Sequence, residues 1–229
     1  SDDFTSCIPL TSGQLSSNET ILTIAPKESF NYSTAYKIKF TTELQNTYGE
    51  SLTENSTTTF STQNLGVYTF GSNNYGQLGL GDQANRSSAA SLTPQSQSLG
   101  VKDIAAGELH TLMLMGDGTV KSYGHNGDGQ LGHGDTTDRY SPTSLSGISG
   151  VRDVETSMSQ SFLLMEDGTV KSFGRNFNKQ LGHLDGLNRS SPETIPGLSH
   201  IKQVSSGREF TLVLTESGVV KSFGLNHVG

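Results

Sequence analysis

The apolar residues of this chain occur in short runs, and each run is followed by a turn that contains glycine. A representative stretch reads IAAGELHTLMLM (104–115), then GDG (116–118), then TVKSYG (119–124). Further along, the corresponding turns read EDG (166–168) and ESG (216–218). Asp-Gly or Ser-Gly between two apolar runs is typical of a tight hairpin, because such a turn needs a positive φ. No run sustains a 3.6-residue period, so the pattern predicts an all-β chain of short strands.

The pattern returns at a fixed interval along residues 65–229. A strand that ends in an aromatic residue and glycine occurs four times, and its final glycines lie 53, 50 and 50 residues apart, at Gly71, Gly124, Gly174 and Gly224. The tripeptide QLG and the strand that begins at 107 recur with the same spacing. A unit of about 50 residues with four short strands has the size of one β-propeller blade.

Taken together, these elements resemble the repeat of the regulator of chromosome condensation family. Their order is G-x-V-x-x-aromatic-G, then Asn, then GQLG-x-GD, then a strand with G-x-x-His-T-L, then DG-x-V. The resemblance covers residues 65–229, about three repeats and the start of a fourth, and it implies a β-propeller. The sequence departs from the family in two ways. The aromatic residue, usually Trp there, is Phe or Tyr here, and the third copy has Lys179 in place of a loop glycine and Ser157 in place of a strand-start glycine.

The stretch GHNGDGQLGHGD (124–135) offers two chemical alternatives to a repeat turn. Gly127, Gly129 and Gly132 match the G-x-G-x-x-G spacing of a dinucleotide-binding loop. The same positions read NYGQLG at 74–79 and FNKQLG at 177–182, and no helix follows, so we expect no cofactor. His133 and Asp135 have the spacing of metal ligands, but their counterparts belong to successive blades and do not converge, so we expect no metal.

One set of positions recurs in every copy, and we interpret these residues as structural. The asparagine two residues after each aromatic–glycine pair is expected to cap a turn, and the glycines to permit tight bends and close approach of blades. The aspartate after QLG-x-G is expected to cap the next turn with its carboxylate. The repeat residues are Gly71, Asn73, Gln77, Gly79, Gly124, Asn126, Gln130, Gly132, Gly174, Asn176, Gln180, Gly182, Gly224 and Asn226.

A second set of loop positions varies freely between copies. A position that varies is not needed for blade packing, so it is expected to be exposed, and a ring of such positions is where a propeller usually holds a partner. The alternative interpretation, that each is a plain solvated loop residue, remains open. The candidate partner-binding residues are Ser72, Asn74, Tyr75, His125, Asp128, Arg175, Phe177, Asn178, Leu225 and His227.

Residues 1–64 contain no copy of the repeat and are rich in Ser and Thr. Strands are predicted at 21–24, 36–40 and 57–62, of which YKIKF (36–40) alternates apolar and polar residues. The segment resembles the C-terminal part of a bacterial immunoglobulin-like surface-protein domain, with Pro26 ending one strand, Tyr36 leading the next, a G-x-x-L loop at 49–52, and a last strand that ends at 60–62. Such sandwiches usually have seven strands over about 100 residues, so an incomplete sandwich is expected here.

The number of repeats leads to the same expectation for the propeller. Closed propellers have about 4–8 blades, whereas residues 65–229 hold about three at this period. We therefore expect part of a larger propeller, in a fragment cut inside both domains or in a chain that closes with another copy.

Composition limits the classes of function. The formal net charge is −7, with 15 Lys+Arg against 22 Asp+Glu, so we expect no nucleic-acid partner. No apolar run reaches the length of a membrane span, so no membrane insertion is expected. The single cysteine, Cys7, cannot form an internal disulfide. No Ser/His/Asp spacing supports a catalytic triad, so we assign no catalytic residue and expect no enzyme.

The leading hypothesis is a non-enzymatic binding module that displays loops to a protein or a glycan. The pairing with a surface-type domain indicates an extracellular or cell-surface protein of bacterial origin. The family resemblance implies an alternative, a guanine-nucleotide exchange factor for a small GTPase, which acts through surface shape rather than a triad. An enzyme-inhibitor role and a purely structural spacer also stay open.

Overall fold

The computed structural model describes residues 10–15, 22–26, 35–40, 56–61, 67–92 and 100–226, and these residues form seventeen strands and no helix. The chain folds as two compact units, residues 1–64 and 65–229. Cys7, His227 and the loop at 49–52 lie outside the described residues. The absence of helices among these residues agrees with the all-β prediction.

In the first unit the described strands form two antiparallel hairpins. Strand β1 (Leu10–Leu15) pairs with β2 (Leu22–Pro26), and β3 (Ala35–Phe40) pairs with β4 (Ser56–Ser61) in an uninterrupted register. The strands β2, β3 and β4 lie within a residue or two of the positions that the sequence predicts. Strand β1 was missed, because its sequence LTSGQL shows neither alternation nor a run of β-branched residues.

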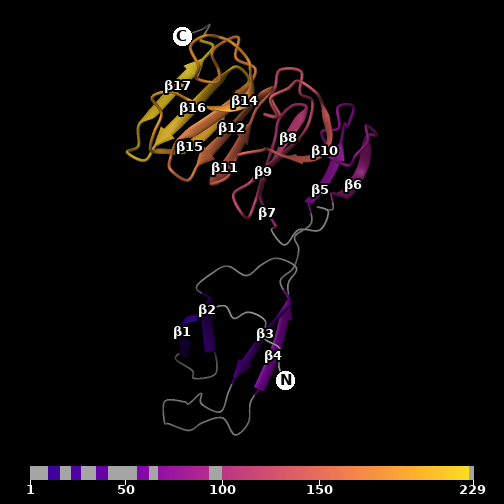
Figure 1. Ribbon diagram of the computed structural model, residues 1–229, viewed down its shortest axis with the longest axis vertical. Helices are drawn as coiled ribbons and strands as arrows, with labels where there is room; N and C mark the ends of the chain where they lie inside the picture. Colours follow the sequence, from indigo (N-terminus) through magenta and orange to yellow (C-terminus); the bar gives the residue numbers. More distant parts are fainter. Residues whose placement is uncertain are drawn as a thin grey trace. The chain divides into compact units, whose positions relative to one another are not determined.

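In the second unit the strands form four antiparallel sheets that follow one another in chain order (Figure 1). The first sheet contains two strands and the last contains three, while the two sheets between them each contain four. The strands are β5 (Val67–Gly71), β6 (Arg86–Leu92), β7 (Val101–Ala106), β8 (His110–Met115), β9 (Val120–Gly124), β10 (Arg139–Ser144), β11 (Val151–Thr156), β12 (Gln160–Met165), β13 (Val170–Gly174), β14 (Arg189–Thr194), β15 (Ile201–Ser206), β16 (Phe210–Thr215) and β17 (Val220–Gly224).

The hairpin turns form where the Asp-Gly pairs predict them. Gly118 has φ +77°, and its amide donates to the carbonyl of Met115 at 3.0 Å. Asp117 fixes the turn through its carboxylate, which accepts hydrogen bonds from the amide and the hydroxyl of Thr119 at 3.0 and 2.6 Å. These hydrogen bonds to the ionised form lower the pKa of Asp117. The turn therefore needs glycine for its backbone and aspartate for its hydrogen bonds.

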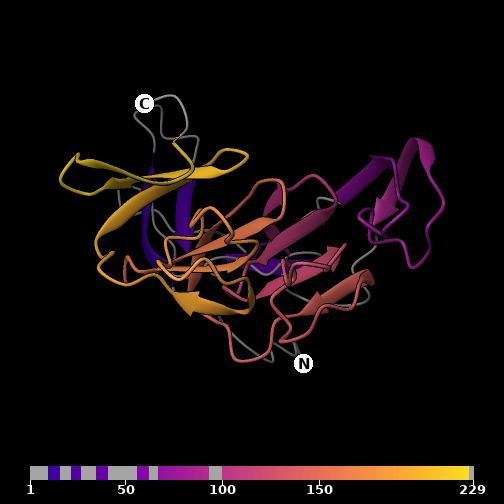
Figure 2. The same ribbon diagram turned by 90° about the horizontal axis from the view of Figure 1, so that it is seen from above.

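The core lies between adjacent sheets, and the succession of these sheets is seen from above in Figure 2. Strand β8 is buried along its whole length because alternate side chains enter different clusters. Leu112 and Leu114 pack with Val154 of the following sheet, whereas Met113 and Met115 pack against the preceding sheet. Each central sheet is therefore apolar on both faces, as a propeller blade must be.

The end sheets leave equivalent positions uncovered. Leu212 and Val220 are 38% and 61% exposed, although Leu112 and Val120 at the same repeat positions are fully buried. At the other end, Phe70 is 69% exposed while its counterpart Tyr123 is 1% exposed. Leu212, Val220 and Phe70 each lie on a sheet face that, among the described residues, has no neighbouring sheet. A further blade would cover that face. This arrangement is the partial propeller that the sequence predicts.

Candidate functional site

The loops that join the last two strands of the first three sheets lie at one end of these sheets, and we call this end the loop face. It comprises residues 72–85, 125–138 and 175–188, between β5 and β6, β9 and β10, and β13 and β14. In an antiparallel sheet these loops share an end with the turns between the first two strands. The amides of His125 and Arg175 accordingly donate to the carbonyls of Leu109 and Ser159 at 2.8 and 2.9 Å.

A buried asparagine closes each loop from inside. The Oδ1 of Asn126 accepts the amide of Leu131 at 2.9 Å, and its Nδ2 donates to the carbonyls of Asp135 and Thr137 at 3.0 and 3.1 Å. Its own amide donates to Asp138 Oδ1 at 2.7 Å. The structure places Asn73 and Asn176 in closely similar hydrogen-bond arrangements, and all three asparagines are fully buried. Each loop is therefore held in one conformation by its own sequence.

An aspartate and an arginine close the far end of each loop. Asp135 Oδ1 accepts the amide of Thr137 at 2.9 Å, and its Oδ2 lies 2.7 Å from Arg139 Nη2. The Thr137 amide, and then the Arg139 guanidinium, lower the pKa of the Asp135 carboxyl. Asp82 with Arg86 and Asp185 with Arg189 repeat the pair at 2.6 and 2.7 Å. The aspartate caps predicted from the sequence are thereby confirmed.

The two residues weighed as metal ligands have other partners. Asp135 is engaged as described, and His133 Nε2 lies 2.9 Å from the hydroxyl of Ser122. Burial and the charge of Arg139 lower the pKa of His133. Over the ranges that the structure describes, no group of three or more His, Cys, Asp or Glu side chains converges as a metal site would require.

Glycines allow each loop to approach the next sheet. Gly132 has φ +76°, and a Cβ at this position would lie 2.8 Å from the Phe173 ring of the following sheet. The neighbouring Gln130 carbonyl accepts the hydroxyl of Ser161 at 2.7 Å, and Gln130 Oε1 accepts the amide of Asp128 at 2.9 Å. The aromatic residue of one repeat thus packs against the QLG glycine of the previous one.

Several of the variable candidates contact a neighbour on the loop face. The rings of Tyr75 and His125, on adjacent loops, lie 4.8 Å apart at 70°, and His125 Nδ1 accepts Gln130 Nε2 at 2.9 Å. Asp128 Oδ1 accepts Asn188 Nδ2 of the next loop at 2.9 Å. Arg175 lies over the Phe177 ring with 5.2 Å between its Cζ and the ring centroid.

The other candidate partner-binding residues make none of these side-chain contacts. Ser72 and Asn74 are exposed, and Asn178 and Leu225 are half-buried. The backbone amide of Asn178 donates to Gln180 Oε1 at 2.8 Å, which fixes the loop rather than the Asn178 side chain.

Three large apolar residues, two in the loop face and one in the adjoining strand β10, were missed by the sequence interpretation. Tyr140, Leu184 and Leu187 are 41%, 84% and 62% exposed. Leu184 aligns with Gly81 and Gly134, so extending the internal alignment to the second half of each loop would have found it.

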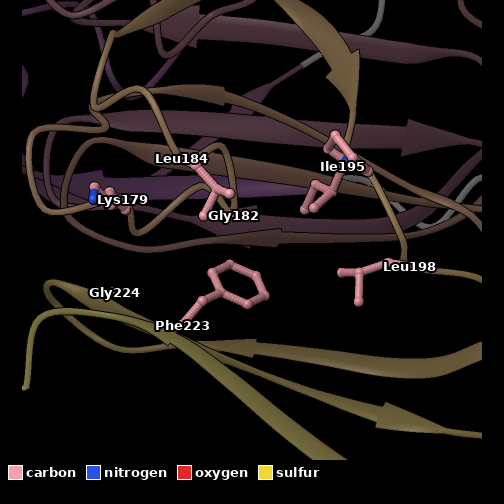
Figure 3. A pocket seen from close by; sticks show the side chains of 8 residues that line it. Lys179, Gly182, Leu184, Ile195, Leu198, Phe223 and Gly224 are labelled. Atoms are coloured by element: carbon pink, nitrogen blue, oxygen red, sulfur yellow. The ribbon is translucent and has the colours of Figure 1, made fainter.

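A cleft of about 230 Å³ lies between parts of the β11–β14 and β15–β17 sheets. Figure 3 shows the Phe223 ring pointing from β17 toward Gly182 and Ile195, with Leu184, Leu198 and Lys179 around the opening. In the preceding sheets the loop amides of Gly81 and Gly134 donate to carbonyls of the fourth strand of the next sheet, at 2.8 and 2.7 Å. Strand β17 is the third strand of its sheet, and among the described residues no fourth strand lies beside it. The cleft is found at this uncovered edge of β17.

Comparison with known proteins identifies the repeat. A family model described as regulator of chromosome condensation (RCC1) repeat matches residues 66–114, 117–164 and 167–214, and a related model matches 101–130 and 201–229. The second and third matched repeats start at the third strand of one sheet and end in the second strand of the next, so repeat and blade are out of phase. A bacterial Ig-like domain model matches residues 3–62.

Solved structures and curated proteins include similar chains. Human WBSCR16 is 27% identical with a TM-score of 0.62, over 74% of this chain and 44% of that one. Prp20p from Saccharomyces cerevisiae is 24% identical with a TM-score of 0.61, over 74% and 42%, which shows the fold alone. The X-linked retinitis pigmentosa GTPase regulator of Mus musculus is 46% identical over 81 residues, and the probable E3 ubiquitin-protein ligase HERC4 of Homo sapiens is 35% identical over 82.

The chain spans less than half of these solved structures, and the matched segments make up 8% of the two curated relatives. The described residues include no helix long and apolar enough to cross a membrane. The expected fold class, a partial propeller with an immunoglobulin-like segment before it, is confirmed. Because the repeat model matches more than half of the residues, this chain belongs to the family of proteins with RCC1 repeats.

Proposed function

We propose that this chain is a non-enzymatic protein-interaction module whose loop face holds a protein partner. The observation that carries the proposal is the placement of the variable positions. Side chains that differ between repeats, and that blade packing does not require, lie together at one end of the sheets, where Tyr75 meets His125 and Arg175 meets Phe177.

The chemistry of the loop face supports this function. Tyr75 and Phe177 are 39% and 63% exposed, and aromatic residues with arginine are enriched among the residues that dominate binding energy. The buried asparagines hold the backbone under them, so little loop freedom is lost when a partner binds. A rigid scaffold with exposed aromatic loops fits recognition better than catalysis.

The comparisons with known proteins support a protein partner and a location at or outside the cell surface. One solved structure is of Kap60 bound to yeast RCC1 (Prp20), and another addresses the binding of Prp20p to Gsp1p and histones. We propose a protein partner for this chain as well. The bacterial Ig-like match over residues 3–62 supports a placement at the surface of a bacterial cell or outside it.

A substitution taken from the chain's own repeats tests the binding proposal. Tyr75 aligns with Asp128 and Asn178, so Tyr75→Asn leaves a residue that this loop already tolerates. Tyr68, 64% exposed on β5, aligns with Lys121, Lys171 and Lys221, so Tyr68→Lys is the matched control. Envelope and secreted proteins of the source organism are captured on each variant and quantified by mass spectrometry. We expect a partner that Tyr68→Lys retains and Tyr75→Asn weakens, and equal capture by both variants would refute the proposal.

Nucleotide exchange on a small GTPase is a second candidate function. It is supported by the 46% identity with the mouse GTPase regulator over 81 residues. The release of a fluorescent GDP analogue from a panel of small GTPases distinguishes the two functions. Accelerated release that the chain catalyses at substoichiometric concentration would favour exchange over simple binding.

A further inference from the structure

The β13–β14 loop carries large apolar side chains where the other two loops carry small or polar ones. Phe177 aligns with Asn74 and Gly127, and Leu187 aligns with Ala84 and Thr137. Phe177 and Leu187 are 63% and 62% exposed, so neither contributes much to the core. Three versions of one loop within one chain thus show that the fold does not require these two side chains.

The same loop keeps the internal hydrogen bonds of the others. Leu181 donates its amide to Asn176 Oδ1 at 3.0 Å, and Arg189 pairs with Asp185 at 2.7 Å. Lys179 nevertheless has φ +61°, at a position that is glycine in both other loops. A lysine in this region is less favourable than glycine. The loop therefore departs from the other two in backbone chemistry as well as in its exposed side chains.

The two apolar residues lie on one part of the loop. A Cβ placed on Gly186, next to Leu187, would lie 3.6 Å from the carbonyl oxygen of Phe177. Asn188 is held on both sides, because its Oδ1 accepts the Asn176 amide at 2.9 Å and its Nδ2 donates to Asp128. Phe177 and Leu187 are thus presented on a fixed piece of backbone.

The charged group that lies against Phe177 is positive. The Arg175 guanidinium lies over the Phe177 ring, and within the described residues no carboxylate lies within 4.0 Å of it. The one acidic residue between 175 and 188 is Asp185, and its carboxylate is paired with the Arg189 guanidinium. An arginine stacked on an aromatic ring still presents N–H donors that fit a carboxylate.

Leu184, in the same loop, belongs to a different surface feature. Its 84% exposure has another cause, because it borders the cleft beside β17, where no fourth strand is described.

We propose that Phe177, Leu187 and Arg175 form a docking patch for an acidic, apolar segment of a protein partner. An apolar side chain of the segment packs between Phe177 and Leu187, and a neighbouring Asp or Glu pairs with Arg175. The inference rests on the proposed protein-binding function and names the residues and the partner chemistry. Two apolar side chains and one stacked arginine match a peptide segment in size, whereas a membrane surface calls for a broader apolar and basic area.

The test uses substitutions that the other loops already contain. The full chain is immobilised and a phage-displayed library of random 12-residue peptides is selected on it, with counter-selection on Phe177→Asn/Leu187→Thr. Enriched peptides are synthesised and their affinities measured by fluorescence polarisation against the wild type, the double variant, Arg175→Ser and Tyr68→Lys. Circular dichroism and thermal unfolding check that each variant keeps the fold.

We expect enriched peptides that combine an aromatic or leucine residue with Asp or Glu. Their affinity should fall at least about tenfold in the double variant and in Arg175→Ser, and change less than about twofold in Tyr68→Lys. Reversing the charge pair, with Arg175→Glu and lysine in place of the peptide carboxylate, should restore binding.

Three results would overturn the docking patch. The first is a selection that enriches no peptide. The second is a set of enriched peptides that bind the double variant as tightly as the wild type. The third is sedimentation of the wild-type chain with phosphatidylserine vesicles that is lost in the double variant. Partner capture that depends on Tyr75 but not on Phe177 would also overturn it while leaving the proposed function intact.

Discussion

Replacement of His110 by glutamine is expected to remove much of the acid sensitivity of the propeller unit. His110 begins β8 and is 1% exposed. Its Nε2 lies 2.9 Å from Ser161 Oγ, and that hydroxyl donates its own proton to the Gln130 carbonyl. His110 Nε2 must therefore be the donor to Ser161, which leaves the proton of the neutral ring on Nε2 and none on Nδ1.

A second proton would place a charge on a ring that is almost completely buried. Nδ1 is buried and has no hydrogen-bond partner. Burial, and to a lesser degree the charge of His125, lower the pKa of His110 to about 4, while the backbone of Gln160 acts weakly in the other direction. In the unfolded chain the pKa of histidine is about 6.5.

The sign and size of the effect follow from linkage. Between pH 6.5 and pH 4 the unfolded chain binds a proton that the folded chain excludes, so unfolding becomes more favourable as the pH falls. The stabilisation is complete above the unfolded pKa and is lost toward pH 4. The shift corresponds to about 3 kcal/mol in total and to about 2 kcal/mol between pH 7 and pH 5.

Urea unfolding at pH 7, 6 and 5, followed by tyrosine fluorescence, measures this loss in the wild type and in His110→Gln. Glutamine occupies the same repeat position at Gln160, which is also 1% exposed and donates to the Arg208 carbonyl at 2.8 Å. We expect the variant to lose about 2 kcal/mol less than the wild type over this range. His133 and His183 are present in both proteins, so their contributions to the pH dependence of stability cancel in the difference. Identical pH dependence in the two proteins would refute the assignment.

Two pairs of substitutions test the loop architecture. Asn126→Ala leaves the buried Leu131 amide without its acceptor, so urea unfolding should show a loss of about 1–3 kcal/mol in the free energy of unfolding. The matched Asn226→Ala removes an exposed side chain and should cost less than about 0.5 kcal/mol. Similar losses in the two variants would contradict the hydrogen-bond network around Asn126. Gly132→Ala and Gly147→Ala both add a side chain at positive φ, but only the first meets a ring, that of Phe173. Thermal unfolding should show an extra loss of about 1–3 kcal/mol for Gly132→Ala, whereas equal losses would count against close packing there.

The local features were within reach of the sequence. Strand positions, Asp-Gly turns and the period of about 50 residues depend on neighbours a few positions away, so β7 to β17 could be expected from side-chain pattern and turn chemistry. The capping role of the aspartates also followed, because Asp135 and Thr137 are two residues apart.

The repeat pattern does not specify which neighbouring sheet or loop covers each copy of the repeat. Phe70 and Phe173 occupy the same motif position, yet one is 69% exposed and the other fully buried, because only Phe173 has a loop glycine of a preceding repeat against it. The contact of Tyr75 with His125 and that of Asn188 with Asp128 join residues of adjacent blades. The sequence by itself determined the blade and its loops. Only the tertiary structure decided which loop residues meet and which apolar faces stay open, since both depend on how the sheets stack.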